Sequence, residues 1–414
     1  MNISDLQLQQ VDAQVKRLIR TDSYYGRLYR EAGITGVATR EDFLKLPFSS
    51  KDDLRNAYPL GIQAVPDEKV VRIHSSSGTT GKPVIIPYTA KDVDDWAIMF
   101  ARCYEMAGIT PMDRIQITPG YGLWTAGIGF QAGCEKLGAM AVPMGPGNTE
   151  KQLQMMMDLK STVICATASY ALVLAEEVEK RGLSDQICLK TGIIGSERWS
   201  DKMRGYIQRT LHIDTFDIYG LTEIYGPGIG IDCPSHNGMH IFDDYVYVEI
   251  IDPKTGLPVE DGEEGEIVLT TLVKEGAPLL RFRTHDISRI IPGKCPCGHD
   301  YPRIDIIRGR SDDMFKVHGV NIFPVQIEEI LAAFDGVTSE YRIDIAHDDT
   351  NNRDMMMITA EANGATVNFE ATGREIRAAV KSKIGCTPKV NVVPMGSLLR
   401  SEKKTARVID HRKI

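Results

Sequence analysis

A loop rich in hydroxyls and glycine, with one lysine, stands out near residue 80 of this 414-residue chain. Residues 74–83 read His-Ser-Ser-Ser-Gly-Thr-Thr-Gly-Lys-Pro, and the apolar segments on either side predict two flanking strands. Hydroxyls, bare backbone N–H groups and an ammonium are the groups that bind a polyphosphate. The residues expected to form this phosphate-binding loop are Ser75, Ser76, Ser77, Gly78, Thr79, Thr80, Gly81 and Lys82.

The spacing of this loop differs from that of the P-loop. Ser76 occupies the position of the first P-loop glycine, and Pro83 follows Lys82 where a Ser or Thr is required. Because Pro83 disfavours the helical conformation at Lys82, we expect a strand rather than a helix after the loop. An ordinary polar hairpin turn is the alternative, since Ser, Thr and Gly gather in turns for conformational reasons alone.

A second group of polar residues, Tyr219-Gly220-Leu221-Thr222-Glu223, ends an apolar segment. Strand ends in α/β sheets are where ligands bind. Tyr219 can stack on a base, Thr222 can hydrogen-bond a phosphate, and Glu223 can hold Mg²⁺. A plain strand-to-helix turn capped by the threonine is the alternative.

Three further polar segments follow. Asp286 ends the run Arg281–Asp286, and an aspartate after a strand can accept both hydroxyls of a ribose. The run Arg308–Asp313 falls where the sequence pattern changes, and a lysine-rich tail occupies residues 400–407. Taken singly, these segments also fit a surface salt-bridge cluster, a linker and a solvated tail.

The elements that must position these residues alternate between strand and helix. We expect helices over residues 5–33, and then an α/β sheet up to about residue 230. Its expected strands are 114–118, 139–143, 163–166, 192–195 and 216–219, and its helices are 90–107, 124–137, 149–158, 170–182 and 200–210. Residues 240–310 predict an antiparallel meander or small barrel. A smaller α+β unit follows, with helices at 324–333 and 370–384 and strands at 341–346, 355–360 and 390–393.

Composition limits the class of protein. The net charge of −8 disfavours a nucleic-acid binder, and no apolar run reaches the roughly 18 residues that cross a membrane. The first residues lack the basic and apolar regions of a signal peptide, so we expect a cytoplasmic protein. Most of the eight cysteines are scattered along the sequence. This distribution is typical of buried free thiols in a reducing compartment.

The order and spacing of these motifs resemble the adenylate-forming (acyl-CoA synthetase-like) superfamily, and within it the phenylacetate-CoA ligase family. The resemblance covers essentially the whole chain. The segments that carry it are Ser75–Pro83, Tyr121–Gly127, Tyr219–Glu223, Arg281–Asp286, Gly309–Met314, Gly319–Pro324 and Gly396–Val408.

The resemblance implies a two-domain α/β fold and a two-step reaction. Residues 1–310 would form a large N-terminal domain with α/β subdomains and a small β-barrel-like subdomain. Residues 311–414 would form a small mobile α+β domain. A carboxylate would attack the α-phosphate of Mg·ATP and give an acyl-adenylate, and coenzyme A would then take the acyl group and release AMP. The implied partners are therefore ATP, Mg²⁺, an aryl acid and coenzyme A, with no nucleic acid and no membrane, and a homodimer stays open.

The resemblance also implies residue roles. The serine-rich loop would hold the β- and γ-phosphates, Tyr219 would pack on adenine, and Asp286 would bind the ribose. Thr222 and Glu223 would act at the phosphates and Mg²⁺. Further nucleotide-site residues are Ser196, Glu197, Asp217, Gly220 and Arg310.

Lys404 matches the catalytic lysine of the family, and Asp312 matches its hinge. The family usually has a glycine before this lysine, whereas Lys403 precedes it here, so the two lysines compete for the role. The register with Arg400 and Arg407 favours Lys404. The acyl pocket would be lined by aromatic and small residues, which suit a flat aryl ring, with phenylacetate first among the arylacetates. These residues are Tyr121, Gly122, Trp124, Thr125 and Gly127.

A cysteine-rich segment predicts a structural Zn²⁺ site. Cys295-Pro296-Cys297-Gly298-His299 forms a knuckle between two expected strands, and Cys233 precedes His236 and His240. Three thiolates and one imidazole suit zinc. Some members of the resembled family carry such a set, which favours Cys233, His240, Cys295 and Cys297, with His236 and His299 as alternative nitrogen ligands.

Three functions are compatible with the sequence. The first is an AMP-forming ligase that joins phenylacetate or a related aryl acid to coenzyme A. The second is an adenylating enzyme that uses another aryl acid or another acyl acceptor. The third is a non-catalytic nucleotide-binding protein, against which Lys82, Glu223, Asp286 and Lys404 argue.

Overall fold

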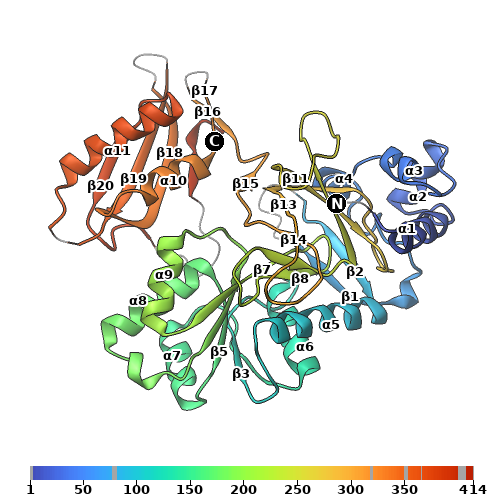
Figure 1. Cartoon of the computed structure of the whole chain (residues 1–414), viewed down its shortest axis with the longest axis horizontal. Helices are drawn as coiled ribbons and strands as arrows, with labels where there is room; N and C mark the ends of the chain where they lie inside the picture. Colours follow the sequence, from blue (N-terminus) through green and yellow to red (C-terminus); the bar gives the residue numbers. More distant parts are fainter. Residues whose placement is uncertain are drawn as a thin grey trace. The chain divides into compact units, whose positions relative to one another are not determined.

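The computed structural model describes residues 3–76, 82–317, 320–348, 353–364, 366–399 and 407–413. The chain divides into two compact units (Figure 1). The first comprises Met1–Ala166, Ile187–Ser196 and Asp214–Ile307, and the second Thr167–Gln186, Glu197–Ile213 and Arg308–Ile414. The expected domain boundary between residues 310 and 311 stays a prediction.

The first unit begins with four short helices. They are α1 (Asp5–Leu18), α2 (Tyr24–Glu31), α3 (Arg40–Lys45) and α4 (Lys51–Asn56). The helical pattern expected over residues 5–33 is confirmed, but it is divided in two. Ser23 caps α2 by accepting the N–H of Gly26, and this serine has left the helical conformation, with ψ of 164°.

A nine-stranded sheet forms the centre of the first unit, in the order β13-β14-β9-β8-β7-β6-β5-β3-β4. All five strands expected between residues 114 and 219 are confirmed. The strands are β3 (Arg114–Ile117), β4 (Met140–Pro143), β5 (Val163–Thr167), β6 (Thr191–Gly195), β7 (Asp214–Leu221), β8 (Gly226–Ile231), β9 (Met239–Ile241), β13 (Ile290–Ile291) and β14 (Arg303–Ile304). The strand β7 runs parallel to β6 and antiparallel to β8, so the sheet changes from parallel to antiparallel where the Tyr219 motif lies.

The helices expected between these strands are also confirmed. They are α5 (Ala90–Met106), α6 (Ala126–Leu137), α7 (Thr149–Asp158), α8 (Ala168–Arg181) and α9 (Asp201–Leu211). In Figure 1, α5 and α6 lie beside β8, and α6 also lies beside β3. The axes of α5 and α6 approach closely because Gly129 and Gly133 face Phe100, where an added Cβ would meet ring or backbone atoms.

The remaining strands of the first unit form two smaller sheets. They are β1 (Val70–Ser75), β2 (Ile85–Thr89), β10 (Val246–Ile251), β11 (Gly265–Thr271) and β12 (Phe282–Ser288). The pair β1–β2 is antiparallel and flanks the serine-rich loop, as expected. The meander β10-β11-β12 is confirmed, whereas the expected barrel-like closure is not.

The second unit has its own apolar core, formed by residues such as Ile343, Ile358 and Ile376. Its expected helices and long strands are confirmed, and its sheet has the order β20-β19-β18-β21. Besides α8 and α9, its elements are α10 (Pro324–Ala332), α11 (Phe369–Ile384), β15 (Gly309–Arg310), β16 (Phe315–Val317), β17 (Val320–Ile322), β18 (Val337–Asp348), β19 (Arg353–Ala362), β20 (Lys389–Val393) and β21 (Val408–Asp410). Composition did not reveal β16, β17 and β21, which have three residues each.

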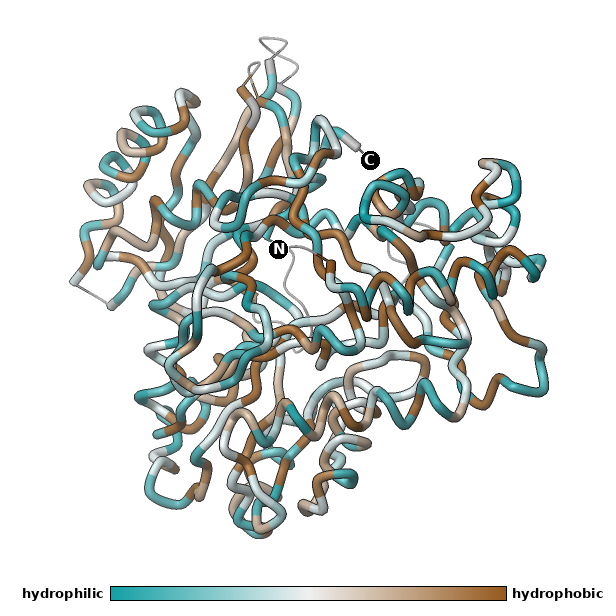
Figure 2. Tube along the Cα trace, turned by 45° about the vertical axis from the view of Figure 1, so that its right-hand side comes forward, coloured by the Kyte–Doolittle hydropathy of each residue, from teal (hydrophilic) through white to brown (hydrophobic). Residues whose placement is uncertain are grey.

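Hydrophobic colour follows the strands and one side of most helices, while turns are hydrophilic (Figure 2). In the described parts of the chain, no helix has both the length and the apolar character that crossing a bilayer requires.

The close approach of α5 and α6 gives a test of the packing. We expect Gly133→Ala to destabilise the protein by about 2–3 kcal/mol, because a Cβ at Gly133 would lie 2.2 Å from that of Phe100. Gly205→Ala on α9 is the matched control. There the nearest atom is the guanidinium end of Arg209, so alanine should be neutral or stabilising. Thermal unfolding of both variants measures the difference, and an unchanged midpoint for Gly133→Ala would contradict this account of the packing.

Candidate active site

Two predicted nucleotide residues meet at the end of β7. The hydroxyl of Tyr219 donates a hydrogen bond of 2.9 Å to Oδ2 of Asp286, which lies on β12. The residues are 67 positions apart in the sequence. The tyrosine ring is buried, and its partner carboxylate is half-buried. This contact places an aromatic face and a carboxylate side by side, as binding of a nucleoside requires.

The turn after β7 carries Thr222 and Glu223. Oγ1 of Thr222 lies 3.2 Å from Oγ1 of Thr125, so the turn contacts the segment expected to line the acyl pocket. Glu223 is only 4% exposed, and its Oε1 lies 2.8 Å from Nζ of Lys51 on α4. A single carboxylate of this kind fits Mg²⁺, which binds through one or two carboxylates together with substrate phosphates and water.

The serine-rich loop is closed at its base. The N–H of Ser76 donates to the carbonyl of Val84, and the N–H of Val84 donates to Oγ of Ser76, at 3.0 and 2.9 Å. The N–H of Ser75 donates to the carbonyl of Leu123. This bond links the loop to residues 121–127, which we call the acyl segment because they are expected to line the acyl pocket. Lys82 is exposed, with Nζ 5.5 Å from the centre of the Tyr58 ring. Ser77, Gly78, Thr79, Thr80 and Gly81 lie outside the described residues.

The acyl segment combines buried and exposed side chains. Tyr121 packs against Gly127, where a Cβ would lie 2.8 Å from the ring. The Tyr121 hydroxyl is buried and has no hydrogen-bond partner among the described residues, and burial raises its pKa. Gly122 has φ of +87°, which favours glycine. Trp124 is 46% exposed, so its ring is not enclosed in the core.

The other expected nucleotide residues lie on or near the carboxyl ends of β6 and β7. Ser196 directly follows β6 with φ of +72°, and Asp217 precedes Tyr219 by two residues on β7. Gly220 permits β7 to approach β8, since a Cβ there would lie 2.1 Å from the carbonyl of Gly226. Within the second unit, Glu197 accepts the N–H of Ser169 near the start of α8, at 2.6 Å.

Two predicted residues of the second unit bind each other. The guanidinium of Arg310 donates two hydrogen bonds of 2.9 Å to the carboxylate of Asp312, the expected hinge residue. Lys403 and Lys404 lie outside the described residues. Three positions after Lys404, the guanidinium of Arg407 makes two hydrogen bonds to the buried carboxylate of Glu340, at 3.0 and 2.8 Å.

The four expected metal ligands come together. One ligand atom from each of Cys233, His240, Cys295 and Cys297 lies within 4.8 Å of the other three. Sγ of Cys233 is 3.6 Å from Sγ of Cys295, and Sγ of Cys297 is 3.3 Å from Nε2 of His240. His240 donates from Nδ1 to the carbonyl of Tyr301, so Nε2 carries the free lone pair. Burial lowers the pKa of His240 and favours the neutral, ligating form.

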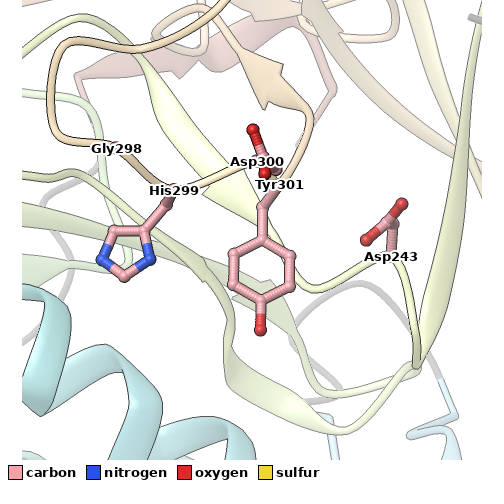
Figure 3. Close-up of a pocket in the computed structure, with 5 residues that line it drawn as sticks. All are labelled: Asp243, Gly298, His299, Asp300 and Tyr301. Atoms are coloured by element: carbon pink, nitrogen blue, oxygen red, sulfur yellow. The ribbon is translucent and has the colours of Figure 1, made fainter.

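The alternative nitrogen ligands are not part of this set of four, although the ring of His299 lies 6.0 Å from that of His240. Nδ1 of His236 is 2.7 Å from a carboxylate oxygen of Asp232, and Nε2 is 3.2 Å from Asp214. His299 lines a hollow beside Tyr301, with which its ring stacks (Figure 3). The geometry therefore favours His240 over both.

Three basic side chains of the first unit, of which His74 and Lys274 are buried and Lys51 is partly exposed, were not predicted as site residues. Lys51 contacts Glu223, as described above. His74 donates from Nδ1 to the carbonyl of Leu123, and burial lowers its pKa to about 4. Lys274 is fully buried and donates to the carbonyl of Ile224, the residue after Glu223. No local pattern marks these residues, because their partners are distant in the sequence.

Comparisons with known proteins identify the family. Residues 8–271 match the AMP-binding enzyme family, and residues 319–412 match the AMP-binding enzyme C-terminal domain. The phenylacetate-coenzyme A ligase of Escherichia coli (strain K12) is 40% identical over 419 residues, which covers 99% of this chain and 95% of that protein. The ligase of the same name from Aromatoleum evansii is also 40% identical, over 98% of this chain and 94% of that protein.

A solved structure extends the agreement to the fold. A 2-hydroxyisobutyryl-CoA ligase in the postadenylation state, in complex with an acyl-AMP, superimposes with a TM-score of 0.88. It is 27% identical and covers 98% of this chain and 89% of that protein. From the site geometry, the two family matches and the identity over nearly the full length, we conclude that this chain belongs to the AMP-binding enzymes and, among them, to the phenylacetate-coenzyme A ligase family.

Proposed function

We propose that this enzyme joins phenylacetate to coenzyme A through a phenylacetyl-adenylate, with release of pyrophosphate and then AMP. The observation that carries the proposal is the convergence at the end of β7. There Tyr219 bonds Asp286 on the nucleoside side, while Thr222 contacts Thr125 on the acyl side. A carboxylate and the α-phosphate of ATP would therefore be held next to each other, which lowers the barrier by orientation.

The roles of the residues follow from their chemistry. Tyr219 would stack on adenine and Asp286 would accept the ribose hydroxyls. Ser75, Ser76 and Lys82, with the loop residues between them, would bind the β- and γ-phosphates. Glu223 would hold Mg²⁺, which neutralises phosphate charge when bound. Nζ of Lys51 lies 2.8 Å from Oε1 of Glu223, so the lysine would have to release the carboxylate when the metal binds.

The acyl segment supports an arylacetate as the acid. Tyr121 offers a ring face beside Gly127, and Thr125 lies at the boundary with the nucleotide. Aromatic walls next to small residues accommodate a flat ring. Gly122 and Trp124 belong to the same segment and complete the proposed pocket.

Residues 311–414 are proposed to act as a mobile domain that supplies Lys404. Asp312 would be the hinge, and its pairing with Arg310 would have to change when the domain turns. We further propose a cytoplasmic location, with which the eight free thiols are in keeping.

Exchange of labelled pyrophosphate into ATP tests the proposed reaction directly. We expect exchange that depends on phenylacetate and exceeds that with benzoate or acetate, and formation of a thioester and AMP when coenzyme A is added. Exchange without any thioester would mean another acyl acceptor. Absence of exchange with every acid would favour a binding protein over an enzyme.

The role of Lys404 gives a separate prediction. Its ammonium would stabilise the charge that develops on the α-phosphate, so we expect Lys404→Ala to slow adenylation about 100-fold or more. Lys403→Ala is the matched control and should retain most of the rate. Thioester formation from supplied phenylacetyl-adenylate should survive in both variants. A larger loss of adenylation in Lys403→Ala would exchange the roles of the two lysines.

We also propose that Cys233, His240, Cys295 and Cys297 bind a structural Zn²⁺. Two thiolates on a tetrahedral zinc lie about 3.8 Å apart, given Zn–S bonds of about 2.3 Å. The distance of 3.6 Å between Cys233 and Cys295 fits that value and is much too long for a disulfide. Four protein ligands leave no position for substrate, so the metal would stabilise the fold rather than act in catalysis.

Metal analysis of protein purified without chelator tests this site. We expect one zinc per chain, and loss of zinc with a lower unfolding temperature in Cys297→Ser. His236→Ala, which removes a nearby imidazole outside the cluster, should keep the metal. A fully folded wild-type protein without zinc would refute the proposal.

A further inference from the structure

The ammonium of Lys274 lies inside the core of the first unit. The residue is 0% exposed, and Nζ donates a hydrogen bond to the carbonyl of Ile224. The ammonium also contacts the rings of Tyr88 and Tyr225, whose centroids lie 4.4 and 4.5 Å from Nζ. Burial lowers the pKa of Lys274 to about 7, while the carboxylates of Asp92 and Glu223 oppose that shift. A buried ammonium is costly, so its position needs an explanation.

The backbone around Lys274 is fixed by the rest of the unit. Its carbonyl accepts hydrogen bonds from Gln14 and Arg17 on α1, at 2.8 and 3.2 Å. The next two N–H groups, those of Glu275 and Gly276, donate to the Asp92 carboxylate at 2.7 and 2.8 Å. The backbone of residues 274–276 is therefore held in place by hydrogen bonds, and the Lys274 ammonium can in turn hold the carbonyl of Ile224 in place.

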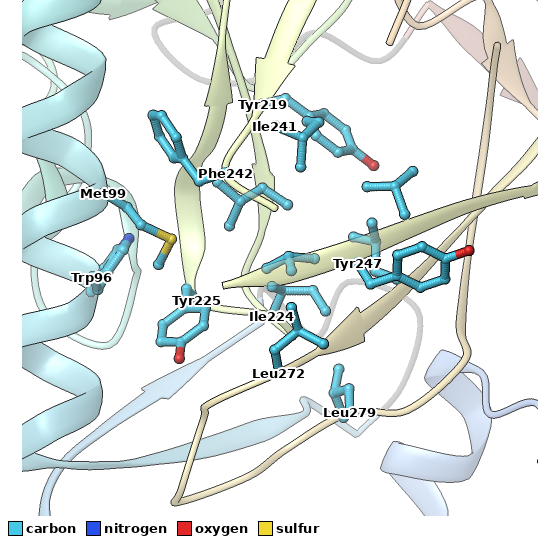
Figure 4. Close-up of a cluster of buried hydrophobic side chains, with 14 of the residues drawn as sticks. Trp96, Met99, Tyr219, Ile224, Tyr225, Ile241, Phe242, Tyr247, Leu272 and Leu279 are labelled. Carbon is cyan, nitrogen blue, oxygen red and sulfur yellow. The ribbon is translucent and has the colours of Figure 1, made fainter. Parts of the chain in front are cut away.

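Two more buried donors hold the backbone that follows Glu223. The hydroxyl of Tyr88 donates to the carbonyl of Tyr225, at 2.8 Å, and the indole N–H of Trp96 donates to the carbonyl of Pro227, also at 2.8 Å. Ile224 and Tyr225 themselves belong to the apolar cluster that contains Trp96 (Figure 4). Side chains from the segment after β11 and from β2 thus hold two successive carbonyls of the turn, those of Ile224 and Tyr225, and Trp96 on α5 holds the carbonyl of Pro227 on β8.

We propose that Lys274 and Tyr88 are positioning residues for adenylation, because their donors to Ile224 and Tyr225 fix the turn that presents Glu223 to the metal of Mg·ATP. The inference rests on the proposed function, since Glu223 acts there on the metal. Lys274 is 0% exposed, so we assign it no contact with substrate. Its effect passes through the peptide directly after Glu223, where a small shift of the backbone moves the carboxylate.

A purely structural role predicts a different result from a positioning role. If Lys274 only filled the core, Lys274→Met would alter stability and leave nucleotide binding unchanged. If it fixes Glu223, the variant should lose the metal-dependent part of ATP affinity and keep the rest. Titration calorimetry of ATP with Mg²⁺ and with excess chelator separates the two, and it needs no turnover.

We expect Lys274→Met to weaken binding of Mg·ATP about ten-fold, the size of one hydrogen bond to a charged group. Binding of metal-free ATP should not change. Tyr88→Phe removes one neutral donor to the same turn and should weaken Mg·ATP about three-fold. Tyr104→Phe is the matched control, because Tyr104 is a buried donor in the same cluster whose partner is the carbonyl of Phe130 on α6. It should lower stability without changing either affinity.

Equal losses with and without Mg²⁺, or no loss in either variant, would overturn the inference. If Lys274→Met gives no cooperative unfolding transition, Tyr88→Phe decides alone, and an unchanged Mg·ATP affinity then refutes it. Wild-type protein that binds Mg·ATP normally but shows no acid-dependent exchange would instead refute the proposed function, while the calorimetry would still decide whether Lys274 and Tyr88 fix Glu223.

Discussion

The turn from Thr222 to Tyr225 must present an acidic side chain while its own backbone lies in an apolar core. Water cannot satisfy carbonyls there, so each needs a protein donor. Lys274 and Tyr88 supply two of them, and Lys51 contacts the Glu223 carboxylate. The site depends on this constraint, because a turn held by buried donors keeps its carboxylate in one place without the help of a ligand.

Most of the elements were predictable because their hydrophobic patterns are strong. The crossover helices and parallel strands alternate regularly, and both β7 and the meander from β10 to β12 appeared where the pattern indicated. The chemistry was readable as well, because short polar motifs follow apolar strands. Residue types suggested a base partner in Tyr219 and a ribose partner in Asp286, the family resemblance assigned both to one nucleotide, and the structure joins them by a hydrogen bond.

What could not be predicted depends on distant pairing. Lys51 sits in an ordinary helix start, and Lys274 follows a strand near a glycine, so neither differs locally from a surface lysine. Their contacts arise only when α4 and the segment after β11 meet the turn after β7. The three-residue strands β16 and β21 were missed for a similar reason, since so short a run has no measurable period.

The cysteine cluster lies where the large sheet is weakest. Beyond β8 the sheet continues only through β9, β14 and β13, which have three, two and two residues, so few backbone hydrogen bonds hold this edge. Cys233 follows β8, His240 lies on β9, and Cys295 and Cys297 lie between β13 and β14. One ion bound by all four would therefore link every short strand to β8, which pairs with β7 and forms the other side of the Glu223 turn. On this reasoning the metal, although remote from the reacting atoms, would help keep the turn in place by stabilising the strand against which it folds.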